Sequence, residues 1–350
     1  MKSKRCLIIM IGSFTIVAII LFIAVCFKGE PSKSKEKNEL EYIVPEEVGW
    51  SSVKLEEAER YAEQIGSAAV MALYDGKVFF SWGKINQKYL IHSIRKPFFG
   101  ALYGIYVKRG LIDLDKSLDE LGIDDIPPGL TSIEKQATVR NLLMSRSGVY
   151  HEAAAEAQVM VETRPERGSH TPGTFFYYNN WDFNVLGTIF EQQTGKKIFE
   201  AFKEEIADPI GMQDFLLTDF RYQYEWNKSK HPAYHFRMTA RDMARFGLLY
   251  QNNGKFGDKQ IISPEWIAES TTPYSIYSSS YYGYLWDIFP EELGLGNGFY
   301  HTGAGVHLLA VLPDAKLVLV HRVDTDKEFD ITGNEILQLI YTILEARILD

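Results

Sequence analysis

Cysteine is almost missing from this chain. Its 350 residues include two, Cys6 and Cys26, and both lie in an apolar stretch at the N-terminus. The chain beyond them therefore has no disulfide, no thiol nucleophile and no thiolate metal ligand. It also lacks the H-E-x-x-H and C-x-x-C patterns by which zinc sites are commonly recognised. These absences exclude thiol chemistry, and they predict a protein that needs no metal and no other cofactor.

Positive charge is scarce beyond the N-terminal part. The chain has 37 Lys and Arg residues, of which 7 lie in the first 45 residues, and 46 Asp and Glu residues, of which 4 lie there. Residues 46–350 therefore carry 30 positive and 42 negative side chains, a net charge of −12. Nucleic acids and anionic membrane surfaces repel a domain with this excess of negative charge. We therefore expect no nucleic-acid partner.

One stretch has no charged side chain at all. Residues 6–27 would form a helix of roughly 33 Å, which is longer than the hydrocarbon core of a bilayer, about 30 Å. Lys2, Lys4 and Arg5 precede this stretch, and such residues favour the cytoplasmic side. The pattern predicts residues 1–5 as a cytoplasmic tail, 6–27 as a single-pass anchor in the cell membrane, and an extracytoplasmic location for the rest.

Two alternatives to an uncleaved anchor remain open. A cleaved signal peptide usually has an apolar run of about 7–15 residues and an A-x-A-like site, and no such site is evident. Lipidation would use Cys26, although Val25 is large for the position before a lipidated cysteine. The polar and charged residues 28–45 predict a flexible linker, so that residues 46–350 would form the folded domain.

Strand patterns occur near both ends of this domain. Two apolar runs in 68–83 flank an Asp-Gly pair, which is a strong hairpin signal. Two more runs in 306–323 flank a Pro-Asp pair, and an amphipathic helix is expected at about 334–348. Other helices are expected at 93–109, 138–149, 181–195, 198–211 and 239–254. The sequence predicts an α/β (α+β) fold: an antiparallel sheet from both chain ends, flanked by helices, with an inserted, mostly helical lobe at roughly 111–285.

The helix expected at 93–109 begins in an unusual way. Pro97 is tolerated only in a first turn, so Ser93 lies at the helix N-terminus and Lys96 shares its face. In a structural interpretation Ser93 is an N-cap, but Lys96 then stands at the wrong end of the helix dipole. In a functional interpretation Ser93 is a nucleophile, Lys96 helps to take its proton, and the helix start supports the resulting oxyanion.

A second stretch of polar residues, 172–187, precedes another expected helix. Tyr178 and Asn180 have a Y-x-N spacing, and Tyr177 and Asn179 have the same spacing shifted by one residue. Either asparagine would also serve as a helix cap, and either tyrosine as a packed ring. A third stretch, His301-Thr302-Gly303, opens the C-terminal hairpin, where a lone histidine also has a structural explanation.

Together and in this order, the three stretches resemble the motifs of the serine beta-lactamase and penicillin-binding-protein superfamily. The resemblance is closest to the branch with class C beta-lactamases and related esterases, where histidine can replace the lysine of the third motif. It covers roughly residues 46–325. A Leu-Gly pair at 186–187 stands at the expected distance from Tyr178 and Asn180, which favours this pair over the shifted alternative.

The resemblance implies acyl transfer by a serine hydrolase. Ser93 would attack a carbonyl, and Lys96 and Tyr178 would form the proton relay, with either of them as the base. Asn180 would orient Lys96 or a substrate amide. The backbone N–H groups of Ser93 and Ala304 would hold the oxyanion, and water would hydrolyse the acyl-enzyme.

The third motif, His301, Thr302 and Gly303, is expected to contact the substrate. Of these three residues, His301 has the greatest influence on which substrate class is expected. An imidazole binds a carboxylate well only when it is protonated, and its ordinary pKa is about 6.5. Beta-lactams are therefore disfavoured, while ester, amide and D-peptide substrates, with a link to the cell wall, stay open. The tyrosine-rich stretch 273–288 would either line the acyl pocket or pack internally. The alternative function is a penicillin-binding sensor or cell-wall binding module without turnover.

The anchor prediction has a direct test. The full-length protein is expected to sediment with membranes, to resist carbonate extraction and to be accessible to protease from outside, because an apolar helix of this length is stable in a bilayer. Cell fractionation followed by N-terminal sequencing measures this. A secreted form that begins between residues 25 and 45 would instead indicate cleavage.

Overall fold

The computed structural model describes residues 39–277 and 280–348. The folded domain begins at Leu40 and forms one compact unit. Among the described helices, none has both the length and the apolar character that a membrane crossing requires. The anchor predicted at 6–27 lies outside the described residues and stays a prediction.

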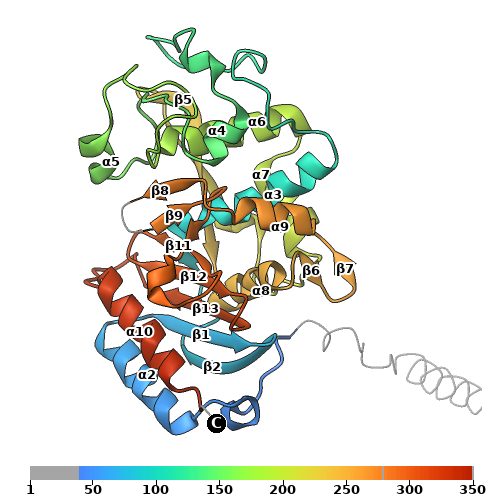
Figure 1. Cartoon of the computed structure of the whole chain (residues 1–350), viewed down its shortest axis with the longest axis vertical. Helices are drawn as coiled ribbons and strands as arrows, with labels where there is room; N and C mark the ends of the chain where they lie inside the picture. Colours follow the sequence, from blue (N-terminus) through green and yellow to red (C-terminus); the bar gives the residue numbers. More distant parts are fainter. Residues whose placement is uncertain (1–38, 278–279, 349–350) are drawn as a thin grey trace, which may run out of the picture. The chain divides into compact units, whose positions relative to one another are not determined.

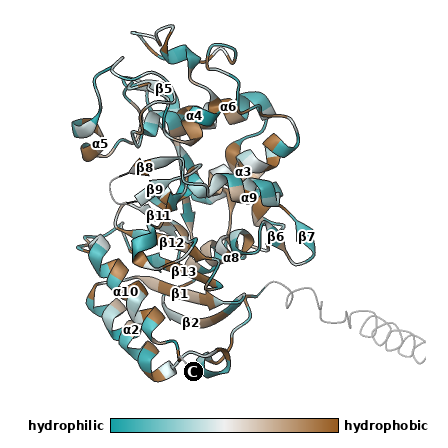
Figure 2. Cartoon of the chain, viewed as in Figure 1, coloured by the Kyte–Doolittle hydropathy of each residue, from teal (hydrophilic) through white to brown (hydrophobic). Residues whose placement is uncertain are grey.

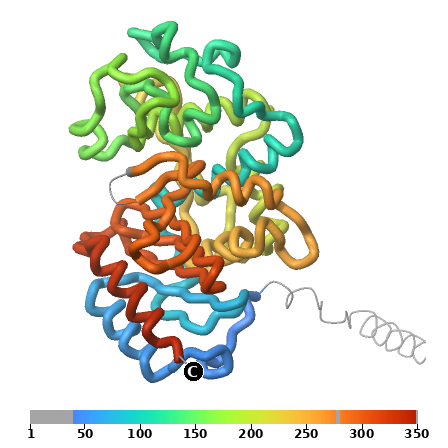
Figure 3. The backbone as a smooth tube through the Cα atoms, in the orientation of Figure 1, coloured from blue at the N-terminus to red at the C-terminus, as the bar shows by residue number. Residues whose placement is uncertain are grey.

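An eight-stranded antiparallel sheet forms the centre of the domain (Figure 1). Strand β1 (Ala69–Tyr74) pairs with β2 (Lys77–Gly83) on one side and with β13 (Leu317–Arg322) on the other. Figure 3 shows the N-terminal part of the domain in blue beside the C-terminal part in red. In the turn between β1 and β2, Asp75 and Gly76 have φ angles of 47° and 86°, as a two-residue hairpin turn requires. The predicted sheet from both chain ends is confirmed.

The sheet continues beyond the predicted hairpins toward one edge. It runs from β13 through β12 (His307–Leu312), β11 (Phe299–Gly303), β10 (Asp287–Ile288) and β9 (Ser280–Tyr282) to β8 (Ser275–Tyr277). The tyrosine-rich stretch thus supplies strands to the central sheet. The lobe boundary expected near residue 285 lies among these strands, because the stretch pairs with β11 instead of closing the helical insertion.

Alternate residues of the central strands face two separate apolar layers. On β12, Leu308 and Ala310 belong to the layer that also contains the buried faces of α2 (Ser52–Gln64) and α10 (Gly333–Glu345). Leu309 and its neighbours on the other face pack toward the inserted segment. Figure 2 shows hydrophobic and hydrophilic residues alternating along α2 and α10. Both faces of the sheet are therefore covered by helices, as predicted.

The segment between β2 and β8 supplies the remaining helices and strands. In chain order these are β3 (Tyr89–Leu90), α3 (Arg95–Lys108), α4 (Val139–Leu143), α5 (Gln158–Thr163), α6 (Asn180–Thr194), α7 (Ile198–Phe202), β4 (Phe220–Glu225), β5 (Ser229–Met238), α8 (Ala240–Gln251), β6 (Lys255–Phe256), β7 (Lys259–Gln260) and α9 (Pro264–Ser270). The insertion is less purely helical than expected, since β3, β5 and β4 form a three-stranded sheet.

Two expected helices are shorter than their apolar patterns indicated. The helix expected at 138–149 ends at Leu143, because Ser145 and Gly148 have φ angles of 54° and 70°, which a right-handed helix does not allow. The segment expected as one helix at 198–211 is α7 followed by one π-helical turn. Pro209 comes two residues after the end of this turn, and proline disrupts a helix interior.

Glycine at position 247 lets α8 approach the sheet. A Cβ atom there would lie 2.4 Å from Val318 Cγ1 of β13, and Val318 is stiff at χ1. We expect Gly247→Ala to lower the free energy of unfolding by about 1–3 kcal/mol through overpacking. Gly333→Ala, at an exposed position with no atom within 4 Å of the added Cβ, is the control and should be neutral or slightly stabilising. Equal melting temperatures for both variants would contradict this packing.

Candidate active site

Ser93 lies in a 3₁₀ turn, His92–Ile94, directly before α3. The helix expected from Ser93 therefore begins two residues later, and Pro97 lies in its first turn, as its lack of an N–H group requires. His92 has a φ angle of 48°, which is uncommon for a residue other than glycine. Its Nε2 lies 2.8 Å from Thr325 Oγ1. This contact holds the strained turn, and Ser93 with it, against the chain that follows β13.

The three residues predicted as catalytic come together. Lys96 Nζ lies 2.8 Å from Ser93 Oγ and 2.6 Å from Tyr178 OH. Lys96 is fully buried, whereas Ser93 and Tyr178 are partly exposed. The aromatic rings of Tyr178 and Phe183 lie 4.5 and 4.4 Å from Lys96 Nζ. The arrangement can move a proton between a reachable hydroxyl, a buried amine and a reachable phenol.

The surroundings of Lys96 favour its neutral form. Burial and the charge of Arg95 lower the pKa of Lys96 well below its usual range, and Asp287 acts in the opposite direction. Asp287 is itself buried, and the loss of water raises its pKa to about 7. A neutral amine can accept a proton from the serine hydroxyl, which an ammonium cannot do.

The structure distinguishes the two possible Y-x-N assignments. Tyr177 donates its hydroxyl hydrogen to the Met160 carbonyl, away from Lys96. Asn179 caps α6 by accepting from the Trp181 N–H group at 3.1 Å. Tyr178 therefore belongs to the site, while Tyr177 and Asn179 hold the loop before α6.

Asn180 does not make the expected contact with Lys96. Its side-chain N–H donates to the Ala155 carbonyl at 2.5 Å, and its Oδ1 is buried without a hydrogen-bond partner among the described residues. Among the residues that the structure describes, no hydrogen bond joins Asn180 to Lys96. Of the two roles expected for Asn180, an interaction with a substrate amide is the one that its free acceptor supports.

Strand β11 lies against the turn that carries Ser93. A Cβ atom at Gly303 would lie 2.6 Å from the Ile91 carbonyl oxygen and 3.1 Å from His92 Cβ. Glycine is therefore required where β11 passes the turn. Ala304 follows immediately and is exposed, so the predicted oxyanion donors come from two backbone segments in direct contact.

His301 and Thr302 point to opposite faces of β11. The buried His301 has its Nδ1 2.7 Å from the Thr302 carbonyl oxygen and 3.9 Å from Asp287 Oδ2, and its Nε2 3.5 Å from Tyr178 OH. Burial lowers the pKa of His301 well below its usual range, and the charge of Arg95 acts in the same direction. A neutral imidazole facing Tyr178 does not fit the expected grip on a substrate carboxylate.

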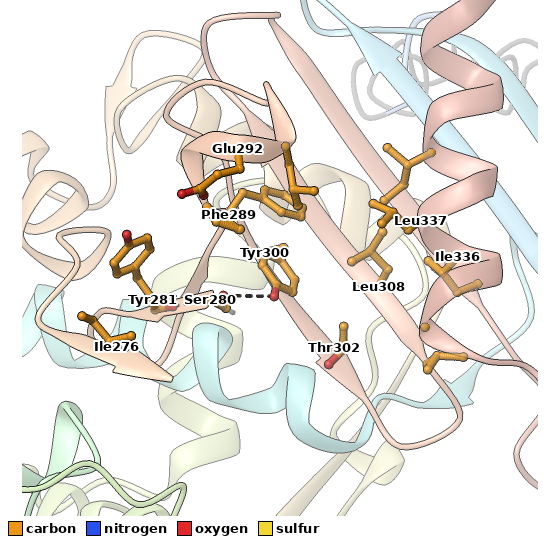
Figure 4. Close-up of a pocket in the computed structure, with 15 residues that line it drawn as sticks. Ile276, Ser280, Tyr281, Phe289, Glu292, Tyr300, Thr302, Leu308, Ile336 and Leu337 are labelled. Carbon is orange, nitrogen blue, oxygen red and sulfur yellow. Dashed lines mark hydrogen bonds between the residues drawn. The ribbon is translucent and has the colours of Figure 1, made fainter. Parts of the chain in front are cut away.

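Thr302 lines a cavity of about 740 Å³ on the other side of β11 (Figure 4). Aliphatic and aromatic side chains form most of its wall: Ile276, Tyr281, Phe289, Leu293, Tyr300, Val306, Leu308, Ile336, Leu337 and Ile340. Its polar groups include Glu292 and the Ser280–Tyr300 pair, whose hydroxyl oxygens are 3.1 Å apart. Part of the tyrosine-rich stretch thus lines a cavity, whereas Tyr282 and Tyr284 are packed internally.

A protein-family model described as Beta-lactamase matches residues 53–339. The chain belongs to the beta-lactamase family. Members of this family are serine hydrolases that act through an acyl-enzyme, and they include esterases and beta-lactamases. The matched range contains all three motifs, so the resemblance and the enzyme class predicted from them are confirmed.

Similar proteins support the fold of this member of the beta-lactamase family. Protein flp of Staphylococcus aureus is 23% identical over 198 residues, which is 50% of this chain and 38% of flp, so the chain spans well under half of that relative. The match to a family VIII carboxylesterase (16% identity, TM-score 0.64) includes 84% of this chain and 97% of the esterase chain. The match to a penicillin-binding protein homologue from Pyrococcus abyssi (19% identity, TM-score 0.60) includes 84% of this chain and 76% of the homologue.

Two charged residues of the site were not predicted from the sequence. Arg95 lies inside the S-x-x-K motif, so the sequence shows a second cation beside Lys96. Its burial is not evident from the sequence. Asp287 is the last residue but one of the tyrosine-rich stretch, and its approach to His301 depends on the pairing of β10 with β11. An isolated aspartate after a tryptophan gives no local signal of this pairing.

The contact at Gly303 generates a prediction. We expect Gly303→Ala to lower kcat/KM at least ten-fold, because the added methyl group displaces β11 from the turn that holds Ser93, and a single misplaced oxyanion donor costs that much or more. Ester hydrolysis and thermal melting are measured together. The control is Gly100→Ala in α3, where the added Cβ meets no described atom closer than 3.5 Å. Full activity of Gly303→Ala would show that this contact does not position the site.

Proposed function

We propose that this protein hydrolyses ester or amide bonds through an acyl-enzyme on Ser93, with uncharged esters as its preferred class. The observation that carries the proposal is the buried Lys96 amine, within hydrogen-bond distance of both Ser93 and Tyr178. This arrangement provides a nucleophile, a base and a second proton carrier.

Lys96 acts as the base in acylation. It takes the Ser93 proton while Ser93 Oγ forms a bond to the substrate carbonyl carbon. The proton then passes through Tyr178 to the leaving oxygen or nitrogen as the bond from carbon to that atom breaks. The N–H groups of Ser93 and Ala304 stabilise the negative oxygen during this step. In deacylation, a water molecule gives its proton to the same relay, and Ser93 recovers its hydrogen.

The preference for uncharged substrates rests on the charge state of His301. A neutral His301 offers no permanent positive charge to a carboxylate. The structural likeness to a carboxylesterase supports the same class.

A location outside the cytoplasm is part of the proposal. The apolar stretch at 6–27 with its preceding positive charges supports an anchor in the cell membrane. An anchored hydrolase would meet substrates at the cell wall, including D-amino-acid peptides. The alternative, a sensor that is acylated without turnover, would use the same three residues, so turnover separates the two functions.

The test is a hydrolysis screen of the full-length protein with p-nitrophenyl esters, nitrocefin and D-amino-acid peptides. We expect turnover of esters and little or none of nitrocefin. Ser93→Ala should abolish both turnover and labelling by a fluorophosphonate, with an unchanged melting temperature, because the hydroxyl is the attacking group. Labelling of another serine in Ser93→Ala, or a stable acyl adduct without turnover, would contradict the proposed activity.

The charge state of His301 gives a second prediction. Because the pKa of His301 is well below its ordinary 6.5, its titration should contribute no loss of activity as pH rises through neutrality. Profiles of kcat/KM from about pH 5 to 9 for one neutral and one anionic ester are expected to have the same shape. A loss near pH 6–7 confined to the anionic ester would show that a protonated His301 binds its carboxylate.

A further inference from the structure

Arg95 is a buried cation without a carboxylate partner. Its side chain is 4% exposed, and among the described residues it makes no ion pair. Its one hydrogen bond, from Nη1 to the His92 carbonyl, is long at 3.4 Å. Nε and Nη2 are buried without a partner in the described part of the chain. The guanidinium carbon lies 5.3 Å from the centre of the Tyr234 ring, which gives some compensation.

Such an arrangement is costly, because burial of an unpaired charge destabilises a protein. Arg167 and Arg241, which are less buried, form ion pairs with Glu134 and Asp214 at 2.8 and 2.6 Å. Arg322 is as buried as Arg95, but it donates to three backbone carbonyls. Arg95 stands directly before Lys96 in the helix that begins at the nucleophile. A costly charge at this place suggests a role in the reaction rather than in stability.

Titratable groups approach Lys96 from several elements. Arg95 precedes it on α3, Asp287 acts from β10, His301 from β11, and Tyr178 from the loop before α6. Of these, Arg95 carries a positive charge at every physiological pH, because a guanidinium does not lose its proton in proteins. Asp287, the group of opposite sign, is itself mostly neutral below about pH 7.

We propose that Arg95 is a positioning residue for the reaction, whose unpaired buried charge keeps the neighbouring Lys96 amine free of a proton and ready to accept that of Ser93. Two adjacent cations in one buried site repel each other, and the one that can lose its proton does so. Lysine can, and arginine cannot. The inference rests on the proposed function, since it assigns Arg95 a role in the activation of Ser93.

The proposal predicts the position of the acid limb in the pH profile. The base must be neutral, so kcat/KM rises with pH through the pKa of Lys96. Removing the Arg95 charge raises that pKa, because the ammonium no longer meets a like charge. In Arg95→Met and Arg95→Gln, the limb should therefore move to higher pH by about one unit or more, which lowers activity below the limb about ten-fold. Activity on the high-pH plateau should change less.

The measurement is kcat/KM for a neutral ester across pH in the full-length protein, together with the rate of labelling by a fluorophosphonate. Arg322→Met is the matched control. Arg322 is also fully buried and has no carboxylate partner among the described residues, but it donates to backbone carbonyls and does not act on Lys96. We expect it to lower the melting temperature without moving the limb. Arg95→Lys, the smallest change, should move the limb in the same direction by less.

The outcomes separate the inference from the proposed function. A limb that stays in place in every folded Arg95 variant, even with lower activity at all pH values, would overturn the role of Arg95 and leave the hydrolase activity standing. A wild-type protein without turnover or labelling at any pH would overturn the proposed function itself. A shifted limb in the Arg95 variants but not in Arg322→Met would support the proposal.

Discussion

The chemistry of this domain depends on the burial of one amine. Lys96 is fully enclosed, and its Nζ contacts the two partly exposed hydroxyls of Ser93 and Tyr178. A buried lysine loses its charge more readily than an exposed one, which turns an ordinary cation into a group that can accept the proton of Ser93. Without that burial, Ser93 would be a weakly nucleophilic serine at the start of a helix.

The fold provides this burial through three segments that are far apart in the sequence. Helix α3 is buried along nearly its whole length. Lys96 lies in its first turn, and Ser93 lies in the 3₁₀ turn directly before it. The loop before α6 brings Tyr178 over Lys96, and β11 closes the other side with His301. The close passage of Gly303 at Ile91 and His92 brings β11 and the Ser93 turn together. The central sheet pairs β1, near the start of the folded domain, with β13, near its end.

The sequence predicted the parts that local chemistry specifies. The S-x-x-K spacing placed Ser93 and Lys96 on one face, and the Asp-Gly pair predicted the first hairpin. The parts that it did not predict depend on contacts between distant segments. The Ser93 helix starts two residues late because Ser93 and Ile94 belong to a 3₁₀ turn that opens with a left-handed His92, which no pattern around it indicates. Asn180 bonds to Ala155 instead of Lys96, and Asp287 reaches His301 only because β10 pairs with β11.

The central claim is that Lys96 is neutral when Ser93 reacts. The most direct test is an NMR titration of the Lys96 side chain in protein labelled with ¹³C-lysine, with the resonance identified by its absence in Lys96→Met. We predict that this resonance titrates well below those of the exposed lysines, whose ordinary pKa is about 10.4, and at the same pH as the acid limb of ester hydrolysis. A Lys96 that titrates together with the exposed lysines would contradict the account.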